Sequence, residues 1–286
     1  MTVNYNLLIP RPAVVDVDAL LAEWDPHAGV DDARPRVSVN FAVTADGSAA
    51  LADGKSGGIG DQGDLAVFRG LRDRVDAVLA GTQTIAAEGY RRLVRDDARR
   101  AERVGRGLVA DPLAATISRS GVLPLGAPML SDPGQRTVAF VPFGFGEHEA
   151  PNGHGDQAAA TEPQPSDPAD ASAHGEDAAQ AADDPSSVVS GGVERVELNP
   201  VTPEAALAHL AGMGVRSVLC EGGPRLVSAL AGADLVDDVF LTIAPKLAGG
   251  GPGMTSGAPL NTPTKLQLTH VAEREGSLFL RWSRPA

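Results

Sequence analysis

Two glycine-containing corners stand where apolar runs give way to helix-like segments. In the first, "LCEGGPRL" at residues 219–226, Glu221 and two adjacent glycines follow an apolar run and precede Pro224. A strand, glycines and a helix start in that order bring backbone N–H groups together at a helix N-terminus, where they can bind an anion. A tight turn that merely requires glycine at positive φ gives the same pattern. Pro224 suits either interpretation, since the first helical position needs no N–H donor.

The second corner favours the anion-binding interpretation. The stretch "AVLAGTQTIAAEGY", residues 77–90, again runs from strand to glycine, hydroxyl and helix, and places Gly81, Thr82 and Thr84 where they can donate to a phosphate. Neither corner has the spacing of the Rossmann glycine fingerprint or of a P-loop, so both familiar nucleotide-binding signatures are absent.

The elements that must position these corners alternate between strand-like and helix-like patterns, which predicts an α/β layer architecture. Helices are predicted after Asp61, after Thr202 and from Pro224. The helix after Thr202 has a proline at its first position and ends at a glycine. A tight turn at Glu275 and Gly276 joins the last two predicted strands. The predicted strands cover 36–43, 75–81, 112–118, 137–142, 193–198, 217–220, 235–245, 265–275 and 277–283.

Charge and composition narrow the function classes. The net charge of −13 disfavours binding to the nucleic-acid backbone. Residues 146–192 hold ten of the acidic residues, no Lys or Arg and few bulky apolar side chains, so they are expected to form a disordered acidic insertion. We therefore divide the chain into an N-terminal extension (1–34), one domain formed by 35–145 and 193–286, and the insertion.

Cysteine and hydropathy patterns exclude further classes. The single cysteine, Cys220, rules out a disulfide framework, and we interpret it as a small packed residue at the end of a buried strand. The histidines of the insertion are irregularly spaced, so no metal site is expected. No apolar stretch reaches membrane-spanning length, and a soluble cytoplasmic protein is the expectation.

The order of several motifs resembles the reductase domain of bacterial riboflavin biosynthesis, which has a dihydrofolate-reductase-like fold. The motifs are "NFAVTADG", "GKSGGIGD", "LRDRVDAVLAGTQTIAAEGY", "LCEGGPRL" and "VDDVFLTIAPKLAGG", and the resemblance covers most of 36–283 outside the insertion. It implies a three-layer domain with a mixed, mainly parallel central sheet. In that family a deaminase partner domain carries a zinc signature that one cysteine cannot supply, so the chain resembles a stand-alone pyrimidine reductase.

The resemblance implies NADPH as the cofactor, which supplies hydride while the protein supplies geometry. Preference for the phosphorylated cofactor needs cationic and hydroxyl donors at its 2′-phosphate, and the donor fork of an arginine suits that task. Arg119 and its neighbours could supply these donors, or they could be an ordinary polar strand end. The residues implied are Gly222, Gly223, Pro224, Arg225 and Leu226 at the pyrophosphate; Gly81, Thr82 and Thr84 in a second cofactor loop; Val43 beside the nicotinamide; and Ser118, Arg119 and Ser120 at the adenosine 2′-phosphate.

On the substrate side, Ser56, Arg72 and Thr84 have the spacing of the riboflavin reductases. By resemblance, Ser56 and Arg72 contact a ribityl or ribosyl phosphate, although Arg72 could equally be a surface helix residue. Glu221 is expected to meet the N–H and amino donors of a pyrimidine ring.

Three further residues complete the predicted site. Asp46, in "TADG", is either a plain turn residue or the catalytic carboxylate that steadies the protonated nitrogen of a C=N bond. Asn40 is expected to line the pocket, and Glu88 keeps the acidic character of the family's pattern after the threonine.

Departures from the family pattern leave the substrate open. Gly58 stands where riboflavin reductases usually have a tryptophan, and "EGYRRLVR" replaces their usual run, so that Arg92 or Arg95 would have to substitute for a lost arginine. Three hypotheses remain: a reductase of 5-amino-6-(5-phosphoribosylamino)uracil type, a dihydrofolate or dihydropterin reductase, and a catalytically silent regulator that binds NADPH. The expected partners are a small heterocyclic substrate and a second copy of the chain in a homodimer.

Overall fold

A single mixed sheet runs through the part of the chain that the computed structural model describes, residues 3–29, 33–144, 187–190, 192–257, 259–260 and 262–285. Its strand order is β2-β1-β11-β12-β10-β3-β9-β4-β5-β6-β8-β7. The strands are β1 (Asn4–Ile9), β2 (Ala13–Asp16), β3 (Arg36–Thr44), β4 (Ala77–Leu79), β5 (Leu113–Ile117), β6 (Thr137–Pro142), β7 (Ser187–Ser190), β8 (Val193–Leu198), β9 (Ser217–Cys220), β10 (Asp238–Ala244), β11 (Gln267–Arg274) and β12 (Ser277–Ser283).

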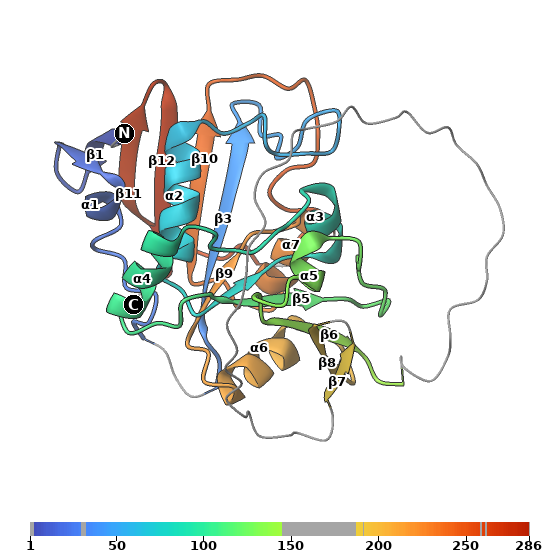
Figure 1. Ribbon diagram of the computed structural model, residues 1–286. Coiled ribbons are helices and arrows are strands. Elements are labelled where there is room, and N and C mark those ends of the chain that lie inside the picture. The colour runs from blue at the N-terminus through green and yellow to red at the C-terminus, as the bar shows by residue number, and fades with distance from the viewer. Residues whose placement is uncertain are drawn as a thin grey trace, which may run out of the picture.

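The central strands, from β10 to β8, are all parallel, whereas antiparallel strands flank them on both sides. In Figure 1 the strands turn from nearly vertical at β3 to nearly horizontal at β5 and β6, as the right-handed twist of a sheet requires. Strand β9 lies between β3 and β4, and the chain then crosses back to place β10 on the other side of β3. In open sheets, ligands bind beyond the carboxyl ends of the strands where the order reverses in this way.

Helices cover both faces of the sheet and bury two separate apolar cores. The helices are α1 (Val17–Leu20), α2 (Gln62–Arg72), α3 (Thr82–Ala87), α4 (Asp97–Gly105), α5 (Pro128–Ser131), α6 (Pro203–Gly212) and α7 (Pro224–Gly232). One core packs side chains of α1, α2, α3 and α5 against the sheet, and α2 crosses the face near β10 and β12 (Figure 1). The other core packs α6 and α7 against the opposite face. The predicted three-layer α/β domain with a mixed, mainly parallel sheet is confirmed.

Every strand and helix start predicted from the sequence has a counterpart in the structure. Asp61 and Thr202 accept hydrogen bonds from the first turns of α2 and α6, as their positions predict. Glu275 and Gly276 adopt positive φ in the turn between β11 and β12, the conformation of a two-residue hairpin turn. Gly47 donates to the Thr44 carbonyl, which closes the turn predicted at "TADG".

The predicted N-terminal extension contributes two strands to the sheet. β1 pairs with β11 through residues such as Asn6 opposite Glu273, and β2 pairs with β1. Tyr5 is buried, stacks edge-on against Phe279, and donates its hydroxyl proton to the Gly63 carbonyl at 2.8 Å. This segment therefore braces the start of α2.

The predicted acidic insertion, 146–192, lies outside the described residues except at its end, where Ser187–Ser190 form β7 against β8. None of the helices in the described ranges is both long and apolar enough to cross a bilayer.

Candidate functional site

An open cavity of about 1700 Å³ lies at the carboxyl ends of the parallel strands, where loops after β3, β4, β5, β8 and β9 converge. It is larger than the pocket of a typical drug-sized ligand, for which about 300–1,000 Å³ is usual. Most residues that sequence analysis singled out line it: Asn40, Ser56, Arg72, Gly81, Thr82, Thr84, Glu88, Ser118, Arg119, Ser120, Glu221, Gly223, Pro224, Arg225 and Leu226. Val43, Asp46 and Gly222 do not line it.

Two helices point uncapped N-termini into this cavity. In α2, α4 and α6 the N-cap side chains of Asp61, Asp96 and Thr202 accept a first-turn N–H. By contrast, α3 begins at Gly81 and α7 at Gly223, and neither has a side-chain cap. First-turn N–H groups have no acceptor inside their own helix, and the helix dipole makes this end partly positive. First-turn N–H groups of both helices thus lack a side-chain acceptor at the cavity, and anion binding by them stays a prediction.

The two corners touch through their backbones. The Gly81 N–H donates to the Gly222 carbonyl at 2.7 Å. Gly222 has φ +92°, and a Cβ there would lie 2.6 Å from the Phe41 ring, so no larger residue fits. A Cβ at Gly223 would lie 2.8 Å from Thr84 Oγ1. Gly222 thus packs closely against the Phe41 side chain of β3, and Gly223 against the Thr84 side chain of the other corner, a tighter requirement than a turn alone imposes.

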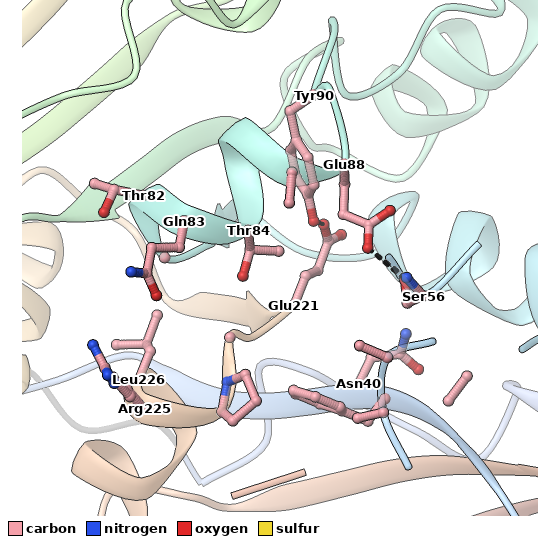
Figure 2. Close-up of a pocket in the computed structure, with 18 of the residues that line it drawn as sticks. Asn40, Ser56, Thr82, Gln83, Thr84, Glu88, Tyr90, Glu221, Arg225 and Leu226 are labelled. Carbon is pink, nitrogen blue, oxygen red and sulfur yellow. Dashed lines mark hydrogen bonds between the residues drawn. The ribbon is translucent and has the colours of Figure 1, made fainter. Parts of the chain in front are cut away.

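Figure 2 shows the two corners facing each other across the cavity: Thr82, Gln83 and Thr84 extend from α3, and Arg225 and Leu226 from the start of α7. Arg225 is exposed and forms no salt bridge with any described residue. Cations and amides without a capping carboxylate are the donor set that a diphosphate needs.

The segment after β5 adds a second cation to this end of the cavity. Arg119 and Ser120 are exposed there, and within the described ranges Arg119 also has no salt bridge. Ser118 is buried, and its hydroxyl donates to the Val122 carbonyl at 2.7 Å, which holds the turn that presents Arg119. Of the three residues predicted at a 2′-phosphate, the structure thus leaves two with their side chains open to solvent.

The opposite end of the cavity is built from side chains that already satisfy one another. The Arg72 guanidinium donates to both carboxylate oxygens of Glu221, at 2.6 and 2.7 Å, and to the Leu93 carbonyl at 3.0 Å. The Tyr90 hydroxyl donates to the same carboxylate at 2.6 Å. Phe68 stacks on Arg72, with 4.2 Å from the guanidinium carbon to the ring centroid.

This triad of Arg72, Glu221 and Tyr90 is almost closed to solvent. The side chains of Arg72 and Glu221 are 12 % and 2 % exposed. Burial raises the pKa of Tyr90 well above its usual value, and the neighbouring Glu221 adds to the rise, so the phenol stays protonated as a donor. Arg72 and Glu221 are predicted to meet a phosphate and a pyrimidine ring separately; in the structure they are each other's partners. Those separate contacts remain predictions that the observed pairing does not favour.

A second predicted pair is also self-satisfied. The backbone N–H and the hydroxyl of Ser56 both donate to Glu88 Oε1, at 2.7 and 2.9 Å (Figure 2). A carboxylate therefore already occupies the donors that the sequence assigns to a substrate phosphate. Arg92, one of the two suggested replacement arginines, pairs with Asp111 at 2.8 Å, whereas Arg95 is exposed at the cavity wall.

Asp46 lies outside the cavity and holds two loops together. It accepts hydrogen bonds from the Thr44 hydroxyl at 2.5 Å and from the backbone N–H groups of Ala248 and Gly249 at 3.1 and 2.8 Å. These bonds, that of Thr44 above all, lower the pKa of the exposed Asp46 carboxyl to about 2. A carboxylate so fully committed, and so hard to protonate, does not suit the predicted catalytic role, and its plain role in a turn fits these contacts better.

Three other residues lie as their strand positions dictate. Asn40 projects from β3 into the cavity (Figure 2), as predicted. Val43 is buried and does not line the cavity, whereas Phe41 and Ala42 of the same strand do. Cys220 is fully buried in the core, as predicted for a small packed residue, and burial raises its pKa to about 12.

Sequence reasoning missed several residues that line the cavity or fix a loop beside it. Tyr90 follows Glu88 by two positions, and nothing local distinguishes it from a surface tyrosine. Lys246 donates to the Gly58 and Ile59 carbonyls at 2.8 Å and so fixes the loop that carries Ser56. Asp64 also lines the cavity. Only the long-range arrangement reveals these roles, because the partners are far apart in sequence.

Comparison with known proteins places the chain in a family. Residues 35–141 and 169–279 match the profile of the RibD C-terminal domain. The 2,5-diamino-6-ribosylamino-4(3H)-pyrimidinone 5′-phosphate reductase of Archaeoglobus fulgidus is 28 % identical over 217 residues, 76 % of this chain and 83 % of that protein. The reductase of the same name from Methanothermobacter thermautotrophicus is 30 % identical over 223 residues, 78 % and 83 % of the two chains.

Solved structures of low identity share the fold. The deaminase/reductase of Thermotoga maritima superposes with a TM-score of 0.59 at 20 % identity over 88 % of this chain, which spans 57 % of that longer enzyme. A pyrimidine reductase-like protein of Corynebacterium diphtheriae gives a TM-score of 0.57 at 19 % identity, over 88 % and 92 % of the two chains. With the profile match over most of its length, this chain belongs to the RibD C-terminal domain family.

Proposed function

We propose that this protein is an NADPH-dependent reductase of a phosphorylated 6-ribosylamino-pyrimidine in riboflavin biosynthesis, which it converts to the ribitylamino form. The observation that carries the proposal is the pair of uncapped helices, α3 and α7, opening on one large cavity in a member of this family. The two archaeal relatives, both reductases of such a pyrimidinone 5′-phosphate, support the substrate class.

The donor-rich end of the cavity is the proposed coenzyme site. The amides at the starts of α3 and α7 would hold the diphosphate, Arg225 would add charge there, and Arg119 with Ser120 would bind the 2′-phosphate. Backbone at Ala42 and Val43 would border the nicotinamide. When bound, the reduced nicotinamide supplies the hydride for the carbon of a C=N bond.

The self-satisfied end of the cavity is the proposed substrate site. Phe68 and Leu65 supply apolar walls for a planar ring, and Asn40 supplies an amide that can both donate and accept. Because Glu88 holds the donors of Ser56, an unphosphorylated heterocycle such as a dihydropterin is the second candidate. A phosphorylated substrate would have to displace Glu88 or place its phosphate near exposed Arg95.

Loss of NADPH absorbance with matched substrates tests these alternatives. We expect turnover with the phosphorylated ribosylamino-pyrimidines, in the diaminopyrimidinone or the uracil form, and much weaker turnover with their dephosphorylated forms and with dihydrofolate. Turnover of dihydrofolate alone would replace the first proposal by the second. Tight coenzyme binding without turnover of any heterocycle would identify a silent NADPH-binding protein.

We also propose that the protein acts as a cytoplasmic homodimer, as expected from the pairing of similar reductases. The edge strand β2 supports an interface between copies, since Val14 there is 71 % exposed. Light scattering that returns the mass of one chain would contradict the dimer, and cell fractionation tests the compartment.

A further inference from the structure

Six carboxylates line the cavity, and one of them differs from the rest in its surroundings. They are Asp61, Asp64, Glu88, Glu204, Glu221 and Glu275. Asp61 caps α2 and accepts from the Ser277 hydroxyl at 2.8 Å; Glu88 is held by Ser56, Glu221 by Arg72, and Glu275 by Arg274. Glu204 is exposed on the first turn of α6.

Asp64 is a half-buried carboxylate in the cavity wall. It forms no salt bridge with any residue that the structure describes, and its hydrogen-bonding neighbour is the Thr242 hydroxyl. A carboxylate that is partly withdrawn from water and has no salt bridge is costly in its ionised form, so such a group holds its proton more tightly than an exposed one.

The backbone around Asp64 leaves space for its carboxyl group. Asp64 lies in the first turn of α2, the helix that packs on the β3 and β10 face of the sheet. A Cβ at Gly60 would lie 2.2 Å from Asp64 Oδ2, so a larger residue at position 60 would expel the carboxyl group from its present place. Gly60 also lines the cavity, which leaves this wall thin beside the carboxyl.

The carboxyl lies across β3 from the glycine corner. Its neighbour Thr242 is in register with Ala42, a cavity-lining residue of β3. The preceding residue, Phe41, faces the opposite side of the sheet and packs its ring against Gly222. Residues 41 and 42 thus separate the glycine corner from the Asp64 carboxyl, with the proposed nicotinamide position at their backbone.

The charges around Asp64 act in both directions. Burial, the largest effect, raises the pKa of Asp64, and the neighbouring carboxylate of Asp61 raises it further. The Thr242 hydroxyl and the Lys246 ammonium oppose this by favouring the ionised form. Tyr5, on β1, faces the same region and stays neutral because burial raises its own pKa. The net effect is a pKa above the usual value for an aspartate, the direction that suits a proton donor.

We propose that Asp64 is the proton donor of the reduction, a catalytic role that rests on the function proposed above. As hydride adds to the carbon of the C=N bond, the electron pair of the π bond moves to nitrogen, and nitrogen takes the proton of the Asp64 carboxyl. A C–H and an N–H bond form, the coenzyme is oxidised, the imine is reduced to an amine, and Asp64 is left as a carboxylate that regains its proton from water.

Replacement of Asp64 by asparagine tests the proposal, because it keeps the shape and removes the transferable proton. We expect kcat to fall about 100-fold, the lower end of the contribution of a general acid, with NADPH affinity unchanged. In the wild type, activity falls as pH rises through the pKa of Asp64, and Asp64→Asn loses this fall. The exposed Asp97→Asn on α4 is the matched control and keeps wild-type rates.

A second variant shifts the titration without removing the acid. Thr242→Val deletes a hydrogen bond that lowers the pKa of Asp64, so the fall in activity moves to higher pH. Infrared difference titration gives a readout without turnover: the wild type shows a carboxylic acid C=O band that persists above the usual Asp range, and Asp64→Asn lacks it.

The outcomes separate this proposal from the proposed function. If the wild-type protein turned over no heterocycle but kept the infrared band, the proposed function would be wrong. The protonated state of the Asp64 carboxyl would still be supported. An active wild type whose pH profile is unchanged in both Asp64→Asn and Thr242→Val would overturn the assignment of Asp64. A change in KM alone in Asp64→Asn would also overturn it, since it would mark a substrate contact without proton transfer.

Discussion

The two ends of the cavity achieve their polarity by opposite means. At the α3 and α7 end, the donors are backbone N–H groups and exposed arginines without protein partners among the described residues. At the other end, hydrogen bonds of 2.6–2.9 Å form two separate sets, one of Arg72, Glu221 and Tyr90 and one of Ser56 and Glu88. The first end leaves its donors without protein acceptors, as the proposed coenzyme site requires. At the second end, the donors and acceptors already pair with one another.

The largest effect is expected from breaking the self-satisfied end. Glu221→Gln removes the charge that balances buried Arg72, and removal of one partner of a buried ion pair typically costs about 3–5 kcal/mol. Urea denaturation should show this loss in the free energy of unfolding. The control, Asp234→Asn, removes an exposed partner of Arg284 and should change stability little. If both variants were equally stable, the triad would not be a structural wall.

Next in size is a change at the donor-rich end. Gly222→Ala forces a Cβ against the Phe41 ring, so the corner must move; we expect at least about a 100-fold weaker affinity for NADPH, or about 2.7 kcal/mol. Calorimetric titration measures this. Gly214→Ala is the control, because Gly214 has a similar φ of +83° but nothing within 4 Å of the added Cβ. Equal coenzyme affinity in the two variants would show that the corner does not hold the coenzyme.

The two ends of the cavity also differ in how well their residues could be predicted from the sequence. The glycine corners are local patterns, since a strand, a glycine and a helix start are contiguous, and backbone N–H groups need no particular side chain. The Arg72 pair joins residues 149 positions apart, so neither residue's spacing reveals the other. The patterns that mark strands and helix N-caps are also local in the sequence. The layers and the sheet were therefore predictable.

The two aspartates show the limit most clearly. Asp46 lies in the turn after β3 and Asp64 in the first turn of α2, and their residue type is the same. The structure commits Asp46 to loop amides and places Asp64, half-buried, in the cavity wall. Burial, which decides the pKa of each carboxyl, is a property of the whole fold and has no local signature. The N-terminal strands were missed for a similar reason, since prolines at positions 10 and 12 obscured the hairpin.

A smaller effect is expected at the outer edge of the donor-rich end. Arg119→Ala removes one exposed cation from the proposed 2′-phosphate site, and we expect about a tenfold weaker affinity for NADPH, or about 1.4 kcal/mol, with the affinity for NADH unchanged. Added salt should shrink the difference, because exposed charges are screened. Arg216→Ala, an exposed arginine before β9, is the control. An equal loss for both coenzymes would place Arg119 away from the 2′-phosphate.

The smallest effect on turnover is expected at Asp46, which belongs to neither end. Asp46→Asn weakens the bonds to Ala248 and Gly249, so hydrogen exchange at those two amides should accelerate severalfold while kcat changes less than about threefold. Because the pKa of Asp46 is lowered to about 2, its carboxylate contributes to stability above the pKa of the unfolded chain, and this contribution is lost as pH falls through that lowered value. The difference in exchange between wild type and variant should therefore vanish only in strong acid. A 100-fold loss of kcat in Asp46→Asn would instead return the proton-transfer role to this residue and leave Asp64 as part of the wall.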